Sequence, residues 1–511
     1  MTISKPSRPG WAACALAVTF LATVAAQADD ARLLDTLHQK GVLSQREYEG
    51  LRGSALSPTQ RAALIDVLRA KGVLNTEEAD KLKAAAPAGA PAEGRAQAQP
   101  AQAQPAQAEQ TQARPVIGYD EGFFIRTADG NFSLRFNGRI ATNFLFSEPH
   151  SSTPNTQTID RARLGFDATF YKYFRVRLEN EFSSGSLLSS SSGLRDAFIA
   201  VTPMPQINLQ AGQFPVPLSY ELILSKKYSN FVERAAVVND TVSPRRDVGV
   251  VAYGQFANKL VQYHLGAMNG AGQNVVDNNS DKDLVAHLVV APFVNDGPEH
   301  LRGFNVGSGV TWGHQPGETV SSGKSTTSSL KGLTETGFTF FPAVTRHGDR
   351  VRWGTHAAWL DGPFSVVSEY IQTEEARDAL GNKGSDLPSL YTDGAYIDGT
   401  WLITGETKPY NARIRPKRPL WDLKNPGPGA WEAALRYEYY KLRHGVGVGA
   451  DGKTDAEVDN RYDAFVAGIN WYPNEFFRFS VNYLYGHFAG KSPNPDQHSN
   501  NAVLCRAQVE F

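Results

Sequence analysis

The stretch that decides the fold is Phe132–Phe146, which reads FSLRFNGRIATNFLF. The even positions are mostly apolar, and the odd positions between them include serine, arginine and asparagine. Alternate residues of a β-strand point to opposite faces of the sheet. These 15 residues therefore predict one strand with an apolar and a polar face, longer than most strands of soluble proteins.

The same alternation returns near the end of the chain. The segments 431–439, 477–485 and 503–511 place apolar side chains at odd positions and mostly polar ones between them. In a soluble sandwich the polar face would meet water and the apolar face a second sheet. In a membrane barrel the apolar face meets lipid and the polar face meets a wet lumen. Alternation alone does not separate these two folds.

Three observations favour the membrane barrel. The chain starts with basic residues, an apolar core over 11–25 and a small-residue cleavage site after Ala28, which is the order of a secretory signal peptide. It ends in Phe511, on the apolar face of the last predicted strand, as outer-membrane barrels typically do. The links between predicted strands are alternately short and long, which is the outer-membrane pattern.

Composition excludes other classes of protein. The 511 residues are 20% charged and 41% hydrophobic with a formal net charge of −1, unlike a disordered tail protein. Past residue 30 no apolar run reaches the length of a membrane-spanning helix. Removal of the signal peptide takes Cys14 and leaves only Cys505, which excludes a disulfide framework and a cysteine metal cluster.

A repeat precedes the strands. Residues 33–52 and 64–83 align without gaps at a spacing of 31, and each unit reads as two short helices around a glycine. The sequence after them is almost entirely Ala, Pro, Gln and Gly, which cannot form a core. The predicted organisation is a signal peptide (1–28), a helical hairpin repeat (29–84), a flexible linker (85–117) and an all-β transmembrane barrel of antiparallel strands (118–511).

The barrel region is predicted to contain sixteen strands. One link, 405–429, is long although it falls on the short-turn side, and Gly337–Val344 is a surplus apolar segment inside a long loop, so eighteen strands are the alternative. The predicted strands are 131–146, 158–171, 173–184, 194–203, 206–214, 247–257, 260–268, 283–292, 302–314, 349–360, 363–374, 391–404, 430–443, 460–472, 476–488 and 501–511.

Sixteen strands enclose an aqueous channel, and pores of this size usually carry one long loop folded inward. The best candidate is the link 215–246, because it is long and rich in charge. Its charged residues include Lys226, Lys227, Glu233, Arg234, Arg245 and Arg246.

Eight short motifs occur in order along 118–511. They are Gly138-Arg139, Arg161-Ala162-Arg163-Leu164, Gly212-Gln213-Phe214, Phe231-Val232-Glu233-Arg234, Asn269-Gly270, Thr404-Gly405-Glu406, Gly429-Ala430-Trp431-Glu432 and Asn470-Trp471-Tyr472. Each is unspecific alone, but the ordered series resembles the phosphate-selective porins of Gram-negative outer membranes (porins O and P). The resemblance implies a sixteen-strand homotrimer whose lumen basic residues pass small anions.

The resemblance gives Arg139 and Arg161 as lumen arginines and also assigns Lys227 and Asp196, while Lys226, Arg245 and Arg246 are added as basic residues of the link 215–246. Lys227 would be the constriction lysine and Asp196 an acidic partner near the central site. If the stretch is extended, Lys226 would point away from Lys227 and make an inert control. The expected anion-binding and pore-lining residues are Lys227, Arg139, Arg161, Asp196, Lys226, Arg245 and Arg246.

This sequence also departs from the family pattern. Residues 315–335 contain no arginine where phosphate-specific members carry an arginine-dense loop, and Asp160 replaces the first of two paired arginines. Residues 118–511 hold 38 basic and 41 acidic side chains, so anion selectivity must come from their placement. A general or other-solute porin, or a barrel with a mainly structural tethering role, are therefore the alternatives.

Nothing in the sequence predicts an enzyme, a cofactor or a metal site, since the 11 histidines are scattered and no Gly-x-Ser-x-Gly motif occurs. The expected partners are small anions, outer-membrane lipid and the barrel-assembly machinery, which would read Phe511 as an assembly signal. No nucleic-acid partner is expected. The expected location is the outer membrane of a Gram-negative bacterium, with the N-terminal region in the periplasm.

Overall fold

The structure is a computed structural model. The predicted signal peptide, the helical repeat and the linker up to residue 113 lie outside the described residues. The described residues are 114–511 apart from 149–153, 184, 186–192, 242–243, 278, 316–317, 322–323, 422–423 and 491–497.

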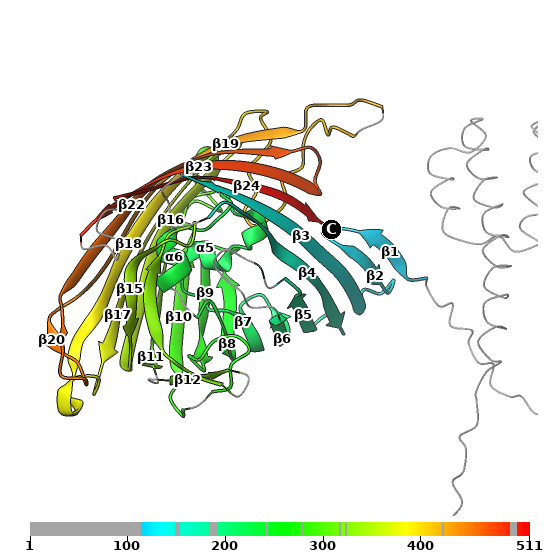
Figure 1. The fold of residues 1–511 in the computed structure, drawn as a ribbon. Coiled ribbons are helices and arrows are strands. Elements are labelled where there is room, and N and C mark those ends of the chain that lie inside the picture. The colour runs from blue at the N-terminus through cyan, green and yellow to red at the C-terminus, as the bar shows by residue number, and fades with distance from the viewer. Residues whose placement is uncertain are drawn as a thin grey trace, which may run out of the picture. The chain divides into compact units, whose positions relative to one another are not determined.

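Sixteen long antiparallel strands form a closed barrel (Figure 1). The prediction of sixteen strands is confirmed, and the strand ends differ from the predicted ones by only a few residues. The strands are β3 Phe132–Ser147, β4 Thr156–Phe170, β5 Phe174–Glu181, β6 Gly193–Met204, β7 Ile207–Pro215, β8 Arg246–Phe256, β9 Val261–Met268, β10 Asp283–Val290, β11 Asn305–Gln315, β16 Gly348–Asp361, β17 Phe364–Arg377, β18 Leu387–Leu402, β19 Ala430–His444, β22 Val458–Tyr472, β23 Phe477–Ala489 and β24 Ser499–Glu510.

The last strand closes the ring on the first. β24 pairs with β3 over Ala502–Glu510, with Glu510 opposite Arg139. In the hydrocarbon core of a membrane every backbone N–H and C=O must find a partner inside the protein, and an open sheet edge would leave a row of them unpaired. Closure of the ring therefore removes the open edge, whose unpaired backbone groups would be unfavourable in lipid.

Two further strands extend the sheet without entering the ring. β1 (Val116–Tyr119) and β2 (Phe123–Arg126) form a short hairpin, and β2 pairs with Ser133–Phe136 of β3. This pairing lies before the stretch of β3 that contacts β24. The sheet thus has eighteen strands while the barrel has sixteen, and the eighteen-strand alternative for the barrel is wrong, because neither 405–429 nor Gly337–Val344 adds a strand to the ring.

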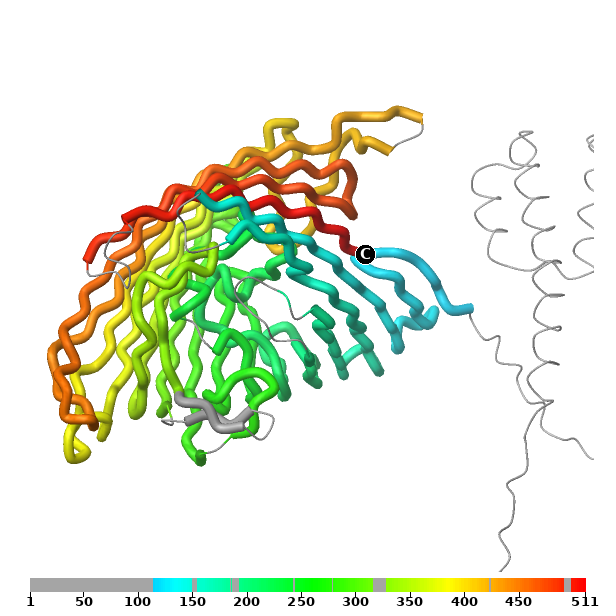
Figure 2. The backbone as a smooth tube through the Cα atoms, viewed as in Figure 1, coloured from blue at the N-terminus to red at the C-terminus, as the bar shows by residue number. Residues whose placement is uncertain are grey.

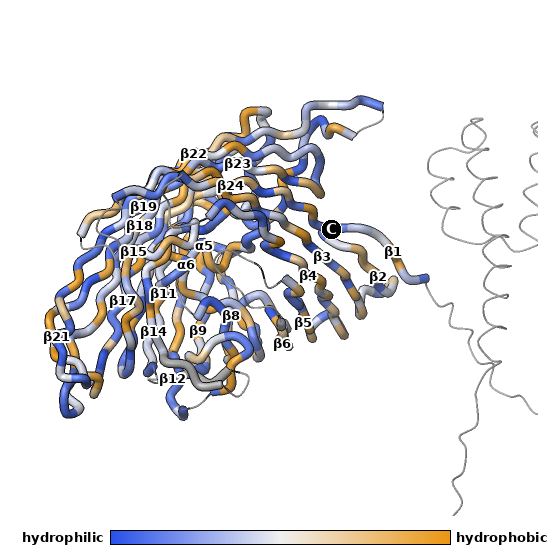
Figure 3. Tube along the Cα trace, viewed as in Figure 1, coloured by the Kyte–Doolittle hydropathy of each residue, from blue (hydrophilic) through white to orange (hydrophobic). Residues whose placement is uncertain are grey.

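Side chains alternate between lipid and lumen along the strands, which Figure 3 shows as alternating hydrophobic and hydrophilic residues. On β3, Ile140 and Phe146 are exposed on the outer face, whereas Arg139 and Asn143 face inward and are buried. On β23, Val481 is exposed outside and Asn482 is buried inside. The alternation read from the sequence therefore separates the two faces of the barrel.

Aromatic side chains ring the end of the barrel that carries the short turns. Trp471 of β22 stacks between Trp431 of β19 and Phe479 of β23, with ring centroids 5.6 and 5.5 Å apart. Phe364 and Trp401 stack on β17 and β18 at 6.3 Å. Short turns face the periplasm in outer-membrane barrels, and aromatic girdles mark the membrane interfaces. We call this end the periplasmic rim.

The link between β7 and β8, residues 216–245, folds into the lumen, as expected. We call it the inward loop. Ser219 Oγ and the Tyr220 amide donate to the Glu369 carboxylate at 3.0 and 2.8 Å, and the Ala236 amide donates to Glu438 at 2.8 Å. These bonds fix the loop to the inner faces of β17 and β19. The loop contains α5 (Tyr220–Ile223), the 3₁₀ turn η1 (Lys226–Tyr228) and α6 (Ala236–Thr241).

Among the described residues, no helix is both long and apolar enough to cross a membrane.

A second segment also fills part of the lumen. β14 (Ser329–Leu333) and β15 (Thr339–Thr345) form a hairpin in the link between β11 and β16. Phe340 packs against Tyr440 and Tyr462 on the inner wall, with ring centroids 5.1 and 5.6 Å away. The surplus apolar segment of the sequence is therefore explained by burial inside the barrel. Together with α6, which contacts β14, β17, β18 and β19, the hairpin fills the lumen beside these strands.

The chain terminus completes the seam between β24 and β3. The Phe511 amide donates to the Gly138 carbonyl at 3.0 Å, and the Gly138 amide donates to Phe511 at 2.8 Å. The Phe511 ring lies over Gly138, where a Cβ atom would be only 2.4 Å from a ring carbon. A glycine at this position leaves room for the terminal aromatic ring on the outer face.

We expect deletion of Phe511 to lower the amount of barrel inserted in the outer membrane, because it removes the last hydrogen-bonded pair of the seam. Single-channel conductance of the molecules that do insert should change little, since the Phe511 side chain carries no charge. Quantitation of heat-modifiable protein in membrane fractions measures the first effect. Phe511→Trp keeps an aromatic side chain and is the control. Normal insertion of the deletion variant would contradict the prediction.

Candidate functional site

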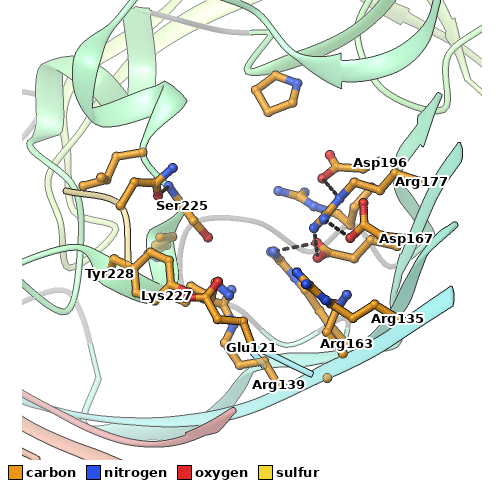
Figure 4. Close-up of a pocket in the computed structure, with 18 of the residues that line it drawn as sticks. Glu121, Arg135, Arg139, Arg163, Asp167, Arg177, Asp196, Ser225, Lys227 and Tyr228 are labelled. Carbon is orange, nitrogen blue, oxygen red and sulfur yellow. Dashed lines mark hydrogen bonds and ion pairs between the residues drawn. The ribbon is translucent and has the colours of Figure 1, made fainter. Parts of the chain in front are cut away.

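A cavity of about 590 Å³ lies between the inward loop and the wall formed by β3–β6 and β8. Figure 4 shows the two sides facing each other, with Lys227 and Tyr228 on the loop and Arg163 and Arg177 on the wall. Its lining contains thirteen Arg or Lys side chains and five carboxylates. This surplus contrasts with the balanced charge of the whole chain, where Lys and Arg total 51 and Asp and Glu total 52.

Strand alternation supplies most of the wall. On β3, Arg135 and Arg139 lie four residues apart and so share the lumen face. Arg175 and Arg177 share the lumen face of β5 by the same rule. The sequence predicts these positions once the apolar face of each strand has been assigned to lipid.

A β-bulge changes the pattern on β4. Ala141 of β3 pairs with Arg161, and the next residue of β3 pairs with Ile159, so Asp160 has no opposite residue. A bulge of this kind inserts one residue and re-aims the side chains beside it. Asp160 and Arg161 are consequently both buried on the lumen side, 1% and 7% exposed, and they form an ion pair of 2.9 Å.

A second bulge lies on β6. Glu179 of β5 pairs with Asp196 and Asn180 pairs with Leu194, which leaves Arg195 as the extra residue. Arg195 and Asp196 therefore both line the cavity, although they are adjacent in sequence. Strict alternation would have pointed one of them toward lipid.

Seven of the thirteen cations are ion-paired. Asp196 has a central place among them, because its carboxylate oxygens lie 2.7 Å from Arg246 and 3.2 Å from Arg177. The other pairs are Arg135 with Asp120, Arg161 with Asp160, Arg163 with Glu181, Arg175 and Arg177 with Asp167, and Lys226 with Glu233, at 2.6 to 3.4 Å.

Lys226 belongs to the network that anchors the inward loop. Its ammonium lies 2.6 Å from Glu233 and 3.8 Å from Asp160, and Arg506 of β24 bridges the same two carboxylates at 3.3 and 2.6 Å. Lys226 is only 7% exposed. Removal of one partner of a buried ion pair leaves an uncompensated charge, which costs several kcal/mol. Lys226 is thus not the inert neighbour of Lys227 that an extended stretch would have given, since both lie in one 3₁₀ turn.

The remaining cations have neutral partners. Arg195 donates to Gln273 at 2.9 Å, Arg234 donates to the Glu221 carbonyl at 2.8 Å, and the Lys227 ammonium lies 4.5 Å from the Tyr228 ring. Within the described ranges, six lining cations have no carboxylate oxygen within 4.0 Å, namely Arg126, Arg139, Arg195, Lys227, Arg234 and Arg245.

Burial disfavours the charged forms of the basic side chains on the inward loop. It lowers the pKa of Lys227 and of Arg245 below their ordinary values. On the wall, Nη2 of Arg139 and Nε of Arg195 are buried and have no hydrogen-bond partner among the described residues. Buried donors of this kind are normally satisfied. A bound anion would satisfy them and would compensate the charge of the cations around it.

The structure places all seven expected site residues on this cavity, namely Lys227, Arg139, Arg161, Asp196, Lys226, Arg245 and Arg246. Sequence reasoning did not single out Arg195 or Asp160 for the lumen, because their orientation depends on the bulges. Arg175 and Arg177 of β5 are both paired with Asp167 of β4.

Such an arrangement can bind oxyanions reversibly. Guanidinium groups match two oxygens of a phosphate or carboxylate, and a partly desolvated site strengthens each interaction. The carboxylates of Asp167, Glu179 and Asp196 reduce the net charge and so limit how tightly an anion is held. Conduction requires binding that is strong enough for entry and weak enough for release.

The chain is similar to several known proteins. A family model described as phosphate-selective porin O and P matches residues 134–511. Porin O of Pseudomonas aeruginosa is 24% identical over 422 residues, which are 78% of this chain and 92% of that protein. Among solved structures, OmpT of Vibrio cholerae matches with a TM-score of 0.47 at 12% identity over 75% of this chain and 98% of that chain. An anion-selective porin from Comamonas acidovorans matches with a TM-score of 0.44 at 12% identity, over 74% and 100%.

We expect Arg195→Gln to lower the preference of the pore for anions, because it removes a cavity charge that no carboxylate compensates. Arg461→Gln is the matched control, since Arg461 is on the outer face of β22 and pairs with Asp463 at 2.6 Å. Reversal potentials in a salt gradient across a planar bilayer measure the difference. Equal effects of the two substitutions would show that Arg195 contributes only to overall charge.

Proposed function

From the premise that this chain belongs to the phosphate-selective porin O and P family, we propose that it conducts small inorganic oxyanions through a lumen lined with Arg and Lys. The family match makes the protein a porin of the Gram-negative outer membrane, and a channel rather than an enzyme. The observation that supports the finer proposal is the convergence of six cations without carboxylate partners on one cavity of the described lumen.

Permeation in this proposal is a sequence of exchanges of hydration water for protein donors. An anion first meets the inward loop, where Lys227 faces the cavity. Arg139 and Arg195 offer unpaired guanidinium donors on the wall opposite. Several weak sites in series pass ions faster than one deep site. Long-range attraction should fade with salt, because exposed charges are screened within about 10 Å at 0.1 M ionic strength.

Specificity for phosphate over other small anions has weaker support from the charges of the cavity. The ion pairs of Asp167 and Asp196 cancel part of the field of three arginines, Arg175, Arg177 and Arg246. This cancellation favours a small-anion porin of broad selectivity as the second candidate. Block of chloride current by phosphate separates the two, because a phosphate-selective pore should be blocked at phosphate concentrations far below that of chloride. A homotrimeric assembly stays a prediction.

Planar-bilayer recording of the purified protein tests the proposal as a whole. An anion-selective reversal potential in a salt gradient is the expected result. Cation selectivity would overturn the proposal. Absence of conductance from correctly folded, membrane-inserted protein would instead favour the structural tether.

Lys227→Glu should shift the reversal potential toward cation preference. Two unit charges 4 Å apart interact by about 1 kcal/mol even in bulk water, so we expect the anion-to-cation permeability ratio to fall about fivefold or more. Lys259→Glu makes the same charge change on an exposed turn between β8 and β9 and is the control. An unchanged reversal potential for Lys227→Glu would place the constriction elsewhere.

The share of selectivity that depends on Lys227 should also depend on pH. Burial lowers its pKa below the ordinary 10.5, so the ammonium loses its proton at a lower pH than an exposed lysine does. Anion selectivity should therefore decline as the pH is raised from neutral to alkaline. Lys227→Arg should keep its selectivity over the same range, because arginine stays protonated. Identical pH profiles for the two proteins would contradict the assignment.

A further inference from the structure

The link between β18 and β19, residues 403–429, is unlike the other connections at the periplasmic rim. It is long although it lies on the short-turn side, and the channel function does not explain its length. Figure 2 shows this gold segment extending past the ends of the neighbouring strands, on the same side of the barrel as the C-terminus. We call the segment 415–428 the periplasmic arm, of which the structure describes 415–421 and 424–428.

The first part of the link turns inward and closes part of the barrel mouth. Ile414 packs in a buried cluster with Leu402 and Tyr472. Lys408 pairs with Glu432, and the Arg413 Nε lies 3.5 Å from Glu510. These contacts fix the base of the periplasmic arm to β19, β22 and β24. The arm therefore leaves the rim from a rigid support.

The periplasmic arm is basic and carries an exposed tryptophan. Its sequence, RPKRPLWDLKNPGP, has four basic residues and one acidic residue. Lys417 and Arg418 donate to the backbone carbonyls of Gly405 and Pro426, which are neutral acceptors. Trp421 is 58% exposed. Arg415 of the arm pairs with Glu475 at 3.2 Å, so Lys417 and Arg418 are the basic residues of the arm whose described acceptors are backbone carbonyls.

The same arm is in contact with the aromatic girdle of the barrel. The Trp421 ring meets Phe477 edge-on, with centroids 5.7 Å apart, and Phe477 is the first outward-facing residue of β23. The indole N–H groups of Trp431 and Trp471 donate to the Pro428 carbonyl at 3.2 and 2.8 Å. These contacts place the arm outside the barrel, at the level where girdle aromatics meet lipid headgroups.

We propose that the periplasmic arm binds anionic phospholipid headgroups of the periplasmic leaflet of the outer membrane. Lys417 and Arg418 supply the positive charge that a lipid phosphate needs, and Trp421 inserts at the boundary between headgroups and acyl chains. Basic residues next to interfacial aromatics are the sequence signature of such a contact. The Trp421–Phe477 contact favours lipid over a soluble polyanion, because Phe477 belongs to the lipid-facing surface. The proposal does not rest on what the pore conducts.

Native mass spectrometry of the full chain in detergent tests the proposal. The protein is incubated with phosphatidylglycerol or with phosphatidylcholine of the same acyl chains, and retained lipids are counted. Wild type should retain more phosphatidylglycerol. The double variant Lys417→Gln/Arg418→Gln should lose this preference by about fivefold per charge removed. Trp421→Ser should also retain less phosphatidylglycerol, although its charge is unchanged.

The matched control is Lys172→Gln/Lys259→Gln, which removes two exposed charges from other turns of the same rim. It should retain phosphatidylglycerol as wild type does. Equal retention of the two lipids by wild type, or equal losses in the arm variant and the control, would overturn the proposal. Ion selectivity in planar bilayers should be the same for the arm variant and wild type, so failure of lipid binding and failure of the channel function give different results.

Discussion

The hydrogen-bonded seam between β24 and β3 is the constraint on which the rest of the molecule depends. A sheet in a membrane has no water to satisfy its edges, so the sixteen strands must form a ring. The ring forces alternate side chains of each strand into the lumen. The interior must therefore accommodate a large set of charged and polar residues, most of which a soluble protein would leave in water.

Two inserted segments, the inward loop and the β14–β15 hairpin, pack differently on the two sides of the lumen. Beside β17–β23, α6 and the β14–β15 hairpin bring apolar residues such as Phe340 against the wall, and buried pairs such as Arg436 with Glu221 compensate the charges there. Beside β3–β6 and β8, the inward loop stands away from the wall and leaves a cavity. The network of Asp160, Arg506 and Glu233 holds the loop at that distance. The apolar packing and the charged cavity thus lie on different sides of one barrel.

Much of this molecule follows from residue alternation. The period of two in Phe132–Phe146 assigns Arg139 to the lumen, and it does the same for Arg163 and Arg177 on the next strands. Two adjacent residues on one face break that period, which is the case for Asp160 with Arg161 and for Arg195 with Asp196. No local composition marks these bulges. They appear only when the register of one strand against the next is known.

The strands, the two faces and the charged character of the inward loop can be predicted from the sequence, because they depend on side chains along one segment. Which charges are compensated depends on the tertiary structure. Lys226 and Lys227 are neighbours in the chain, yet one is bound by Glu233 while the other faces the cavity beside Tyr228. Likewise, in the sequence the periplasmic arm is only an unusually long turn, and the structure adds the contact between Trp421 and Phe477. Ion pairs and ring contacts of this kind depend on which residues other strands place nearby. Residue spacing along one segment does not predict them.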